Sequence, residues 1–268
     1  MIIGFIGSGN MAEALVRGIL DARLAEPKDV IMSDVRPERL VEMHRRYGVR
    51  TEDDNAALAG AVDALVLSVK PQTMGEVLEQ IAQAVRPETA VISIAAGIST
   101  ARIRRALPNV PVVRVMPNTP ALVGAGAAGL YCADPASGAM QTALRIFSAV
   151  GVAVAVDREE LIDTVTAVSG SGPAYFFLLM EHMTQAAVEL GLDAKTAATL
   201  VGQTAKGAAI LAEQAAAEGQ GPADLRKKVT SPGGTTAAAL RVFADEAFEQ
   251  IVRRALTAAR DRSIELSA

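Results

Sequence analysis

The segment Gly4–Leu15, GFIGSGNMAEAL, has glycine at positions 7 and 9 and alanine at position 12. This G-x-G-x-x-A spacing follows an apolar run typical of a β-strand and precedes a helical pattern. Gly7 permits a tight turn, Gly9 lets a pyrophosphate approach the backbone, and Ala12 allows close helix–strand packing. The N-terminus of the helix attracts the phosphate charge. The segment therefore predicts a dinucleotide site, the alternative being a glycine-rich turn in an α/β fold that binds no nucleotide.

The segment is part of residues 1–158, in which short β-rich runs alternate with helical patterns. The expected strands are Ile2–Gly7, Val30–Asp34, Ala64–Val69, Ala90–Ala95, Pro111–Met116, Ala127–Ala133 and Val152–Val156. Several are apolar on both faces, as strands buried between two layers of helices should be. The pattern predicts an α/β fold in which residues 1–158 form a doubly wound, Rossmann-like dinucleotide-binding domain.

Residues 159–268 show only helical periodicity, so we expect an all-α second domain. The first helical stretch is broken only at Ser169–Pro173, Asp193 is placed as the N-cap of the next helix, and the last helix runs from Thr236 to about Glu265. A stripe of mostly small residues at helical spacing comprises Leu200, Thr204, Gly207, Ala208 and Leu211. The apolar run Tyr175–Met180 suits a buried helix better than a surface helix. We therefore expect a dimerisation domain, with a monomeric helical bundle as the alternative.

The composition of the 268 residues narrows the class of protein. Half of the residues are hydrophobic, which is enough for a sizeable core, and Cys132 is the only cysteine, which points to a reducing compartment. The start of the chain lacks a signal-peptide pattern, and no apolar run approaches the roughly 20 residues of a membrane span. A net charge of −4 with mixed signs gives no indication of nucleic-acid binding. We expect a cytoplasmic protein that binds neither nucleic acid nor a membrane.

The second strand ends in residues that bear on the type of cofactor. Asp34 stands where an acidic group would bind the ribose of NAD and repel a 2′-phosphate. Arg36, two residues later, is the type of side chain that binds a 2′-phosphate. The two signals conflict, and Arg36 also fits a solvated loop charge.

The sequence has few groups suited to acid–base or metal catalysis. The two histidines, His44 and His182, lie in helical patterns away from strand ends and glycine loops. No cluster has workable metal-ligand spacing, so we expect no metal site. The nicotinamide must then carry the chemistry, with hydroxyl and backbone groups assisting. An imine suits such a site because a protonated C=N bond is already electrophilic.

A second unusual segment is Lys227–Leu240, KKVTSPGGTTAAAL. Thr230–Ser231 can cap a helix, Gly233–Gly234 allow successive N–H groups to converge, and Thr235–Thr236 begin a helix. The segment predicts an anion site for a small carboxylate, or else an elaborate helix cap. The hydroxyl- and glycine-rich Ser169–Phe177 also meets a helix start and favours a substrate site in this half.

Over essentially its whole length the chain resembles pyrroline-5-carboxylate reductase. The motifs, in chain order, are GFIGSGNMAEAL, SVKPQ, AAGIS, RVMPNTPALVGAG, AVSGSGPAYFF, GLDAKTAATLVGQTAKGAA and LRKKVTSPGGTTAAAL. The last is very specific to the family, whereas the first is shared with many dehydrogenases. The resemblance implies reduction of 1-pyrroline-5-carboxylate to L-proline with NAD(P)H, the last step of proline biosynthesis, usually with NADPH although NADH is possible.

The resemblance also implies the residues of the site. Those expected at the cofactor are Ile6, Gly7, Ser8, Gly9, Asn10 and Met11 at the pyrophosphate, Arg36 near the 2′-phosphate, Asn55 at a ribose, and Ser68, Val69, Lys70, Pro71, Ala95, Ala96 and Gly97 at the nicotinamide half. Those expected at the substrate carboxylate are Ser231, Gly233, Gly234 and Thr235. Thr236 is expected to be catalytic, through a hydrogen bond to the ring nitrogen.

The family's C-terminal helices interlock into a dimer, and dimers often form larger rings, so the resemblance implies a homo-oligomer. Since the SPGGTT loop completes the site near the dimer interface, a monomer should be nearly inactive. One alternative is a β-hydroxyacid dehydrogenase, but Lys195 and Lys206 lie outside that family's lysine motif. Another alternative is a non-catalytic protein that senses NADP(H).

Overall fold

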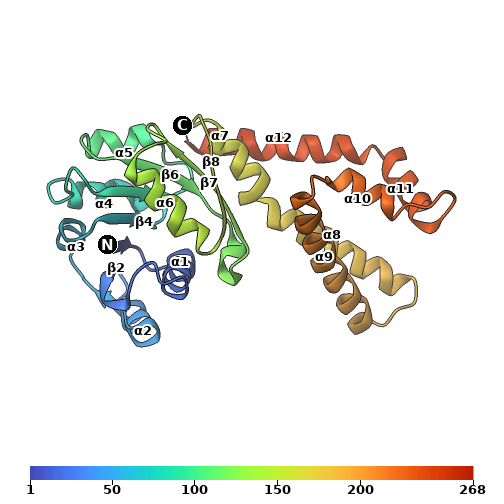
Figure 1. Ribbon diagram of the computed structural model, residues 1–268, viewed down its shortest axis with the longest axis horizontal. Coiled ribbons are helices and arrows are strands. Elements are labelled where there is room, and N and C mark those ends of the chain that lie inside the picture. The colour runs from blue at the N-terminus through green and yellow to red at the C-terminus, as the bar shows by residue number, and fades with distance from the viewer. Residues whose placement is uncertain (268) are drawn as a thin grey trace. The chain divides into compact units, whose positions relative to one another are not determined.

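The structure, a computed structural model, describes residues 1–267, which form two compact units (Figure 1). The first unit comprises Met1–Pro173 together with the C-terminal segment that starts at Leu256, and the second comprises Ala174–Ala255. The domain boundary expected at residue 158 stays a prediction. In the division into compact units, residues 159–173 and the C-terminal segment from Leu256 group with the nucleotide-binding fold.

The first unit is built on an eight-stranded sheet with the order β3-β2-β1-β4-β5-β6-β7-β8. The strands are β1 Ile3–Ile6, β2 Val30–Ser33, β3 Arg50–Thr51, β4 Ala64–Leu67, β5 Ala90–Ser93, β6 Val112–Met116, β7 Gly126–Cys132 and β8 Gly151–Ala155. All neighbours are parallel except β6 and β7. The doubly wound fold and all seven expected strands are confirmed. The two-residue β3 was missed because it is too short to show a period.

Helices cover both faces of this sheet (Figure 1). The first face packs against α1 (Asn10–Asp21), α2 (Pro37–Tyr47) and α6 (Gly138–Ser148). The second face packs against α3 (Asn55–Ala61), α4 (Met74–Ile81) and α5 (Thr100–Ala106). The strands alternate between two apolar cores: in β4, Val66 points to the first and Leu67 to the second. The 3₁₀ turns Pro27–Asp29, Pro71–Thr73 and Thr119–Val123 complete the connections.

Helices make up the rest of the described chain. They are α7 Leu161–Val165, a π-helical turn Thr166–Gly170, α8 Gly172–Glu189, α9 Ala194–Ala217, α10 Pro222–Lys228, α11 Thr235–Asp245 and α12 Phe248–Ser267. The side chain of Asp193 accepts hydrogen bonds from the N–H groups of Lys195 and Thr196, which confirms it as an N-cap.

The structure narrows one expectation about these helices and contradicts another. The break expected at Ser169–Pro173 is confined to Ser171, between the π-helical turn Thr166–Gly170 and α8, which begins at Gly172. The long last helix is two helices, because Ala247 takes the left-handed φ of 52° between α11 and α12. An alanine carries no sequence signal for such a turn, since left-handed backbone normally favours glycine.

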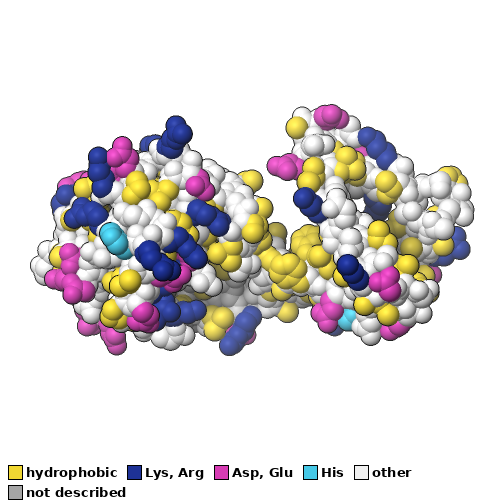
Figure 2. Space-filling view, turned by 90° about the horizontal axis from the view of Figure 1, so that it is seen from below, with side chains coloured by type: hydrophobic (Ala, Val, Ile, Leu, Met, Phe, Trp, Pro, Cys, Tyr) yellow, Lys and Arg dark blue, Asp and Glu magenta, His cyan; other side chains and the backbone are white. Residues whose placement is uncertain are grey.

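The second unit buries little of its own apolar surface. Within Ala174–Ala255 the buried hydrophobic residues are Ala197, Val201 and Ala215. Phe176 and Phe177 of α8 are 69% and 62% exposed, and Figure 2 shows further hydrophobic side chains at the surface. No helix within residues 1–267 is long and apolar enough to cross a membrane.

Candidate active site

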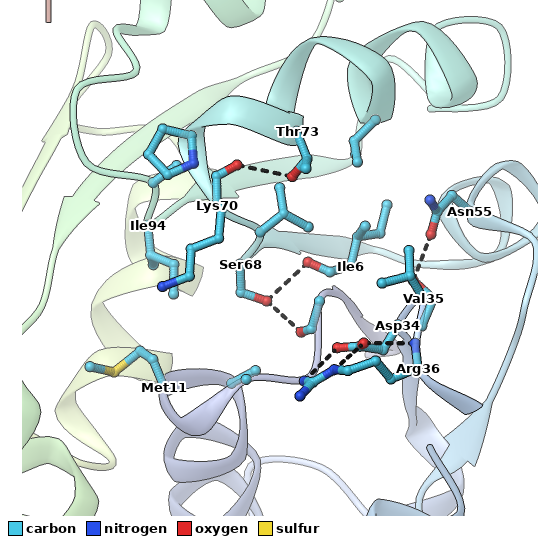
Figure 3. A pocket seen from close by; sticks show the side chains of 18 of the residues that line it. Ile6, Met11, Asp34, Val35, Arg36, Asn55, Ser68, Lys70, Thr73 and Ile94 are labelled. Atoms are coloured by element: carbon cyan, nitrogen blue, oxygen red, sulfur yellow. Dashed lines mark hydrogen bonds and ion pairs between the residues drawn. The ribbon is translucent and has the colours of Figure 1, made fainter. Parts of the chain in front are cut away.

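A cleft of about 1260 Å³ opens where β1, β2, β4 and β5 end in the first unit (Figure 3). This is larger than the roughly 300–1,000 Å³ typical of drug-sized ligands and suits an extended dinucleotide. Parallel strands of an open sheet place ligands at their carboxyl ends. The predicted residues that line it are Ile6, Gly7, Gly9, Asn10, Met11, Arg36, Asn55, Ser68, Val69, Lys70, Pro71, Ala95 and Ala96. Ser8 and Gly97 lie outside the lining.

The loop between β1 and α1 has the geometry that a pyrophosphate requires. Gly7 has a φ of +96°, and a Cβ there would lie 2.7 Å from the carbonyl oxygen of Ser68. The Ser68 hydroxyl donates to the carbonyl oxygens of Ile6 and Gly7 at 3.0 and 2.7 Å. Gly9 is the N-cap of α1, has no side chain to cap the helix, and faces open space where a Cβ would stand. The first N–H groups of α1 are therefore available to an anion.

Asp34 is held by the loop and by Arg36. Its carboxylate accepts hydrogen bonds from the Ser8 N–H at 2.7 Å and from the N–H and Nε of Arg36 at 3.0 and 3.1 Å. Burial raises the pKa of Asp34. The hydrogen bonds from Arg36 and Ser8 together lower the pKa by more than burial raises it, so the pKa lies below its usual value. The carboxylate considered above as a ribose ligand is thus charged and engaged within the protein. The Arg36 side chain is 55% exposed at the cleft.

Asn55 is fixed at the rim by two hydrogen bonds. Its Oδ1 accepts from the Ser33 hydroxyl and its Nδ2 donates to Oε1 of Gln80, both at 2.6 Å. Lys70 extends into the cleft (Figure 3), and no ion pair is found for its ammonium group within residues 1–267. The cleft thus offers an amide of set orientation and a cation to a ligand.

The SPGGTT loop lies in the second unit and leads into α11. Gly233 has the left-handed φ of +71°, and the Gly234 N–H donates to the carbonyl oxygen of Ser231 at 3.1 Å. The expectation that Thr230 and Ser231 cap the helix is wrong. The N-cap is Gly234, without a side-chain bond, and the Thr230 hydroxyl donates to the carbonyl oxygen of Arg226 at 2.6 Å. The N-terminus of α11 is therefore open to an anion, with Ser231, Gly233 and Thr235 exposed beside it.

Comparison with known proteins decides the family. The chain is 47% identical to pyrroline-5-carboxylate reductase from Pseudomonas aeruginosa over 99% of this chain and 96% of the relative. The chain belongs to the pyrroline-5-carboxylate reductase family. It is also 41% identical to the reductase of that name from Methanosarcina acetivorans, over 98% of this chain and 97% of the relative. The resemblance read from the motifs is confirmed.

Solved pyrroline-5-carboxylate reductases share the fold. A structure from Coxiella burnetii matches with a TM-score of 0.93 and 38% identity, covering 99% of this chain and 98% of that one. One from Plasmodium falciparum, solved with NADP bound, matches with a TM-score of 0.85 and 28% identity over 100% and 98% of the two chains. Two sequence-family models also match the chain. The family model described as pyrroline-5-carboxylate reductase dimerisation matches residues 159–266, and the family model described as coenzyme F420-dependent NADP oxidoreductase matches residues 2–97.

Arg39 does not line the cleft but supports the β1–α1 loop beside it, and the sequence did not reveal this role. From α2 its Nε donates to the carbonyl oxygen of Ser8 at 2.7 Å, and its Nη2 to Glu13 of α1 at 2.5 Å. Glu13 also accepts hydrogen bonds from Arg46 and, at 2.8 Å, from the Tyr47 hydroxyl. Burial raises the pKa of Glu13, but these bonds outweigh it and lower the pKa to about 2. The sequence signal was Glu13, an acidic residue in the first turn of the amphipathic helix α1.

Gly97 of the reductase lies against the last turn of α12. It has a φ of +72°, and a Cβ there would lie 2.7 Å from the carbonyl oxygen of Leu266 in the last turn of α12. Its neighbours Ala95 and Ala96 line the cleft. Residues 1–267 contain no group of three or more His, Cys, Asp or Glu side chains placed to hold a metal ion.

Proposed function

We propose that this reductase transfers a hydride from NAD(P)H to the imine carbon of 1-pyrroline-5-carboxylate and forms L-proline, the last step of proline biosynthesis. The observation that carries the proposal is the pair of uncapped helix N-termini. That of α1 opens into a dinucleotide-sized cleft, and that of α11 follows the family-specific SPGGTT loop. Each offers backbone N–H groups to an anion, the first to a pyrophosphate and the second to a carboxylate.

The cofactor is proposed to lie along the carboxyl ends of the strands. The loop from Ile6 to Met11 holds the pyrophosphate, Arg36 the 2′-phosphate of NADPH, and Asn55 a ribose. Ser68–Pro71 and Ala95–Gly97 border the nicotinamide, which supplies the hydride when bound. The open space at Gly9 and the exposure of Arg36 support this placement.

The substrate is proposed to bind at the second loop. Ser231, Gly233, Gly234 and Thr235 hold the carboxylate, and Thr236 hydrogen-bonds the ring nitrogen. As the hydride adds to the imine carbon, the π electrons of the C=N bond move to the nitrogen. The nitrogen keeps or gains one proton and becomes the secondary amine of proline. The hydrogen bond to nitrogen requires no histidine, in keeping with the positions of His44 and His182 in helices.

The protein is proposed to act in the cytoplasm as a dimer or larger homo-oligomer. The helices of the second unit bury three hydrophobic residues between them, and a helical unit with so small a core needs a partner surface. The match of residues 159–266 to a dimerisation region supports a second copy of this chain as that partner.

The test follows the absorbance of NADPH with the purified protein, with and without 1-pyrroline-5-carboxylate, and measures proline formed. We expect one proline for each NADPH consumed. A protein that only senses the cofactor would bind NADPH and leave its absorbance unchanged in both samples. A β-hydroxyacid dehydrogenase would instead reduce NADP⁺ when given a β-hydroxyacid, so this third sample separates the remaining alternative.

A further inference from the structure

A largely buried charge network joins the sheet to the last helix inside the first unit. Arg114 of β6 is 5% exposed, and its Nη1 donates to Oε1 of Glu159 at 3.2 Å. Its Nη2 lies 3.9 Å from Oδ1 of Asp163 in α7, which is 8% exposed. The same Asp163 oxygen accepts a hydrogen bond from the Ser263 hydroxyl of α12 at 2.7 Å. One guanidinium thus links two carboxylates, and one of these holds α12.

The other carboxylate holds the loop beyond β5. Glu159 accepts hydrogen bonds from both the N–H and the hydroxyl of Thr100, at 2.7 and 2.6 Å. Thr100 is the first residue of α5 and directly follows the loop 95–99. This loop contains Ala95 and Ala96, which line the cleft at the expected nicotinamide end.

The loop is held from a second direction by α12. The carbonyl oxygen of Leu266 lies so close to Gly97 that a Cβ at that position would approach it to 2.7 Å. Leu266 stands three residues after Ser263, less than one helical turn away. The bond from Ser263 to Asp163 therefore sets where the last turn of α12 meets Gly97.

Stability alone is a weak reason for such a network. Desolvating buried charges costs free energy that their attraction only partly offsets, and apolar replacements are often equally stable. What directional bonds add is a defined geometry, because each partner has a set position. In this structure the bonds define the geometry of the loop 95–99. Glu159 holds the loop through Thr100, and the last turn of α12 holds it through the contact at Gly97.

We propose that Arg114, Glu159, Asp163 and Ser263 are positioning residues that hold the loop 95–99 in the shape needed at the nicotinamide end of the cleft. The inference rests on the proposed function for the identity of the ligand. Hydride transfer is sensitive to small displacements of the reacting atoms. Disturbing the network should therefore affect the nicotinamide end and leave the adenosine end, at Arg36 and Asn55, unchanged.

The test is made on the full chain with two cofactor probes, NADPH and 2′,5′-ADP, the latter lacking the nicotinamide half. For Ser263→Ala we expect single-turnover hydride transfer to slow about tenfold and the Kd of NADPH to rise about threefold. The Kd of 2′,5′-ADP should stay within twofold of wild type. Ser267→Ala is the matched control, because the Ser267 hydroxyl bonds to the carbonyl oxygen of Ser263 in its own helix.

A second pair of variants approaches the loop from the α5 side. Thr100→Val keeps the shape but removes the hydroxyl bonded to Glu159, and Thr100→Ser keeps the hydroxyl. We expect the valine variant to reproduce the Ser263→Ala pattern and the serine variant to resemble wild type. This pair also decides the matter if Ser263→Ala fails to fold.

The inference is overturned if hydride transfer in both Ser263→Ala and Thr100→Val stays within twofold of wild type. Equal weakening of 2′,5′-ADP and NADPH would overturn it as well, because it indicates a general loss of structure. If the wild type does not reduce 1-pyrroline-5-carboxylate, the proposed function fails. The comparison of the two probes by binding still tests the positioning role in that case.

Discussion

At the residue scale, the neighbouring charges Asp34 and Arg36 have different roles: Asp34 bonds within the protein, whereas Arg36 is exposed at the cleft. The Asp34 side chain is 8% exposed and accepts hydrogen bonds from both Ser8 and Arg36. It therefore orients the β1–α1 loop and the Arg36 side chain together. A hydroxyl of NAD would have to compete with these bonds, whereas a 2′-phosphate would meet the exposed guanidinium directly.

Arg36→Ala should weaken NADPH binding more than NADH binding, since only NADPH carries the 2′-phosphate. We expect the Kd of NADPH to rise about tenfold, or roughly 1.4 kcal/mol, and that of NADH to change less than twofold. Titration of each cofactor by fluorescence measures both values. Arg253→Ala serves as the control, because Arg253 is exposed, paired with Glu249 and absent from the cleft lining. Equal losses for the two cofactors would identify Arg36 as a loop charge without a phosphate partner.

Thr236→Ala should lower turnover and leave cofactor affinity intact. Its proposed hydrogen bond to the ring nitrogen strengthens as the C=N bond is reduced, so its loss should cost about 1–3 kcal/mol in the barrier. Single-turnover kinetics at saturating NADPH measures this step. Thr230→Ala is the matched control in the same loop, because the Thr230 hydroxyl is bonded to the backbone of Arg226. An unchanged rate for Thr236→Ala would remove this residue from the mechanism.

At the scale of elements, α1 and α2 are joined by Glu13 and its three donors. The bonds come from Arg39, Arg46 and Tyr47 of α2, and Arg39 also reaches the carbonyl oxygen of Ser8. The contact supports the start of α1, where the pyrophosphate is proposed to bind. Unlike an exposed surface pair, this carboxylate has several donors at once and is only 17% exposed.

The depressed pKa of Glu13 predicts an acid-dependent loss of stability. Its pKa falls from 4.5 to about 2 on folding, so the stabilisation is fully present above pH 4.5 and is lost as the pH falls toward 2. We expect Glu13→Gln to lower the free energy of unfolding by about 1–2 kcal/mol near neutral pH, allowing for solvent screening.

Urea unfolding of wild type and Glu13→Gln at several pH values measures this difference. The gap between the two proteins should narrow steadily below pH 4.5. Glu249→Gln, in an exposed i,i+4 pair, is the control and should behave as wild type throughout. A gap that stays constant down to about pH 3 would mean that Glu13 acts through shape and not through its charge.

At the scale of the whole molecule, the two units differ in how they bury apolar surface. The first has two extensive cores, one on each face of the sheet. The second has three buried hydrophobic residues and exposed phenylalanines on α8. Obligate oligomers expose such surface in one chain and cover it with another.

Phe177→Glu should reduce the oligomeric state. The Phe177 side chain is 62% exposed in one chain, and burying a glutamate in an apolar interface would be strongly unfavourable. Sedimentation velocity should show wild type as a dimer or larger species and the variant as a smaller one with greatly reduced activity. Val41→Glu, at a 68% exposed position of α2, is the control and should leave the assembly intact. A wild type that sediments as a monomer at micromolar concentration would contradict the proposal.

Much of the fold follows from local patterns that the sequence carries by itself. The glycine spacing at Gly7 and Gly9, the apolar strands and the helical periods are properties of short segments, and they predicted seven of the eight strands and the doubly wound class. The sequence also predicted the family, because the SPGGTT motif is contiguous and specific to it. The sequence did not predict backbone turns that lack a characteristic residue type. Examples are the left-handed turn at Ala247 and the π-helical turn at Thr166–Gly170.

What only the tertiary structure decided is which distant residues share a partner. Asp34 meets Ser8 across 26 positions, Arg39 meets Glu13 across 26, and Ser263 meets Asp163 across 100. No local period encodes such pairs, since each depends on how separate elements pack on the sheet. Sequence periodicity reports which face of an element is apolar, whereas the choice of hydrogen-bond partner depends on distances that exist only after folding.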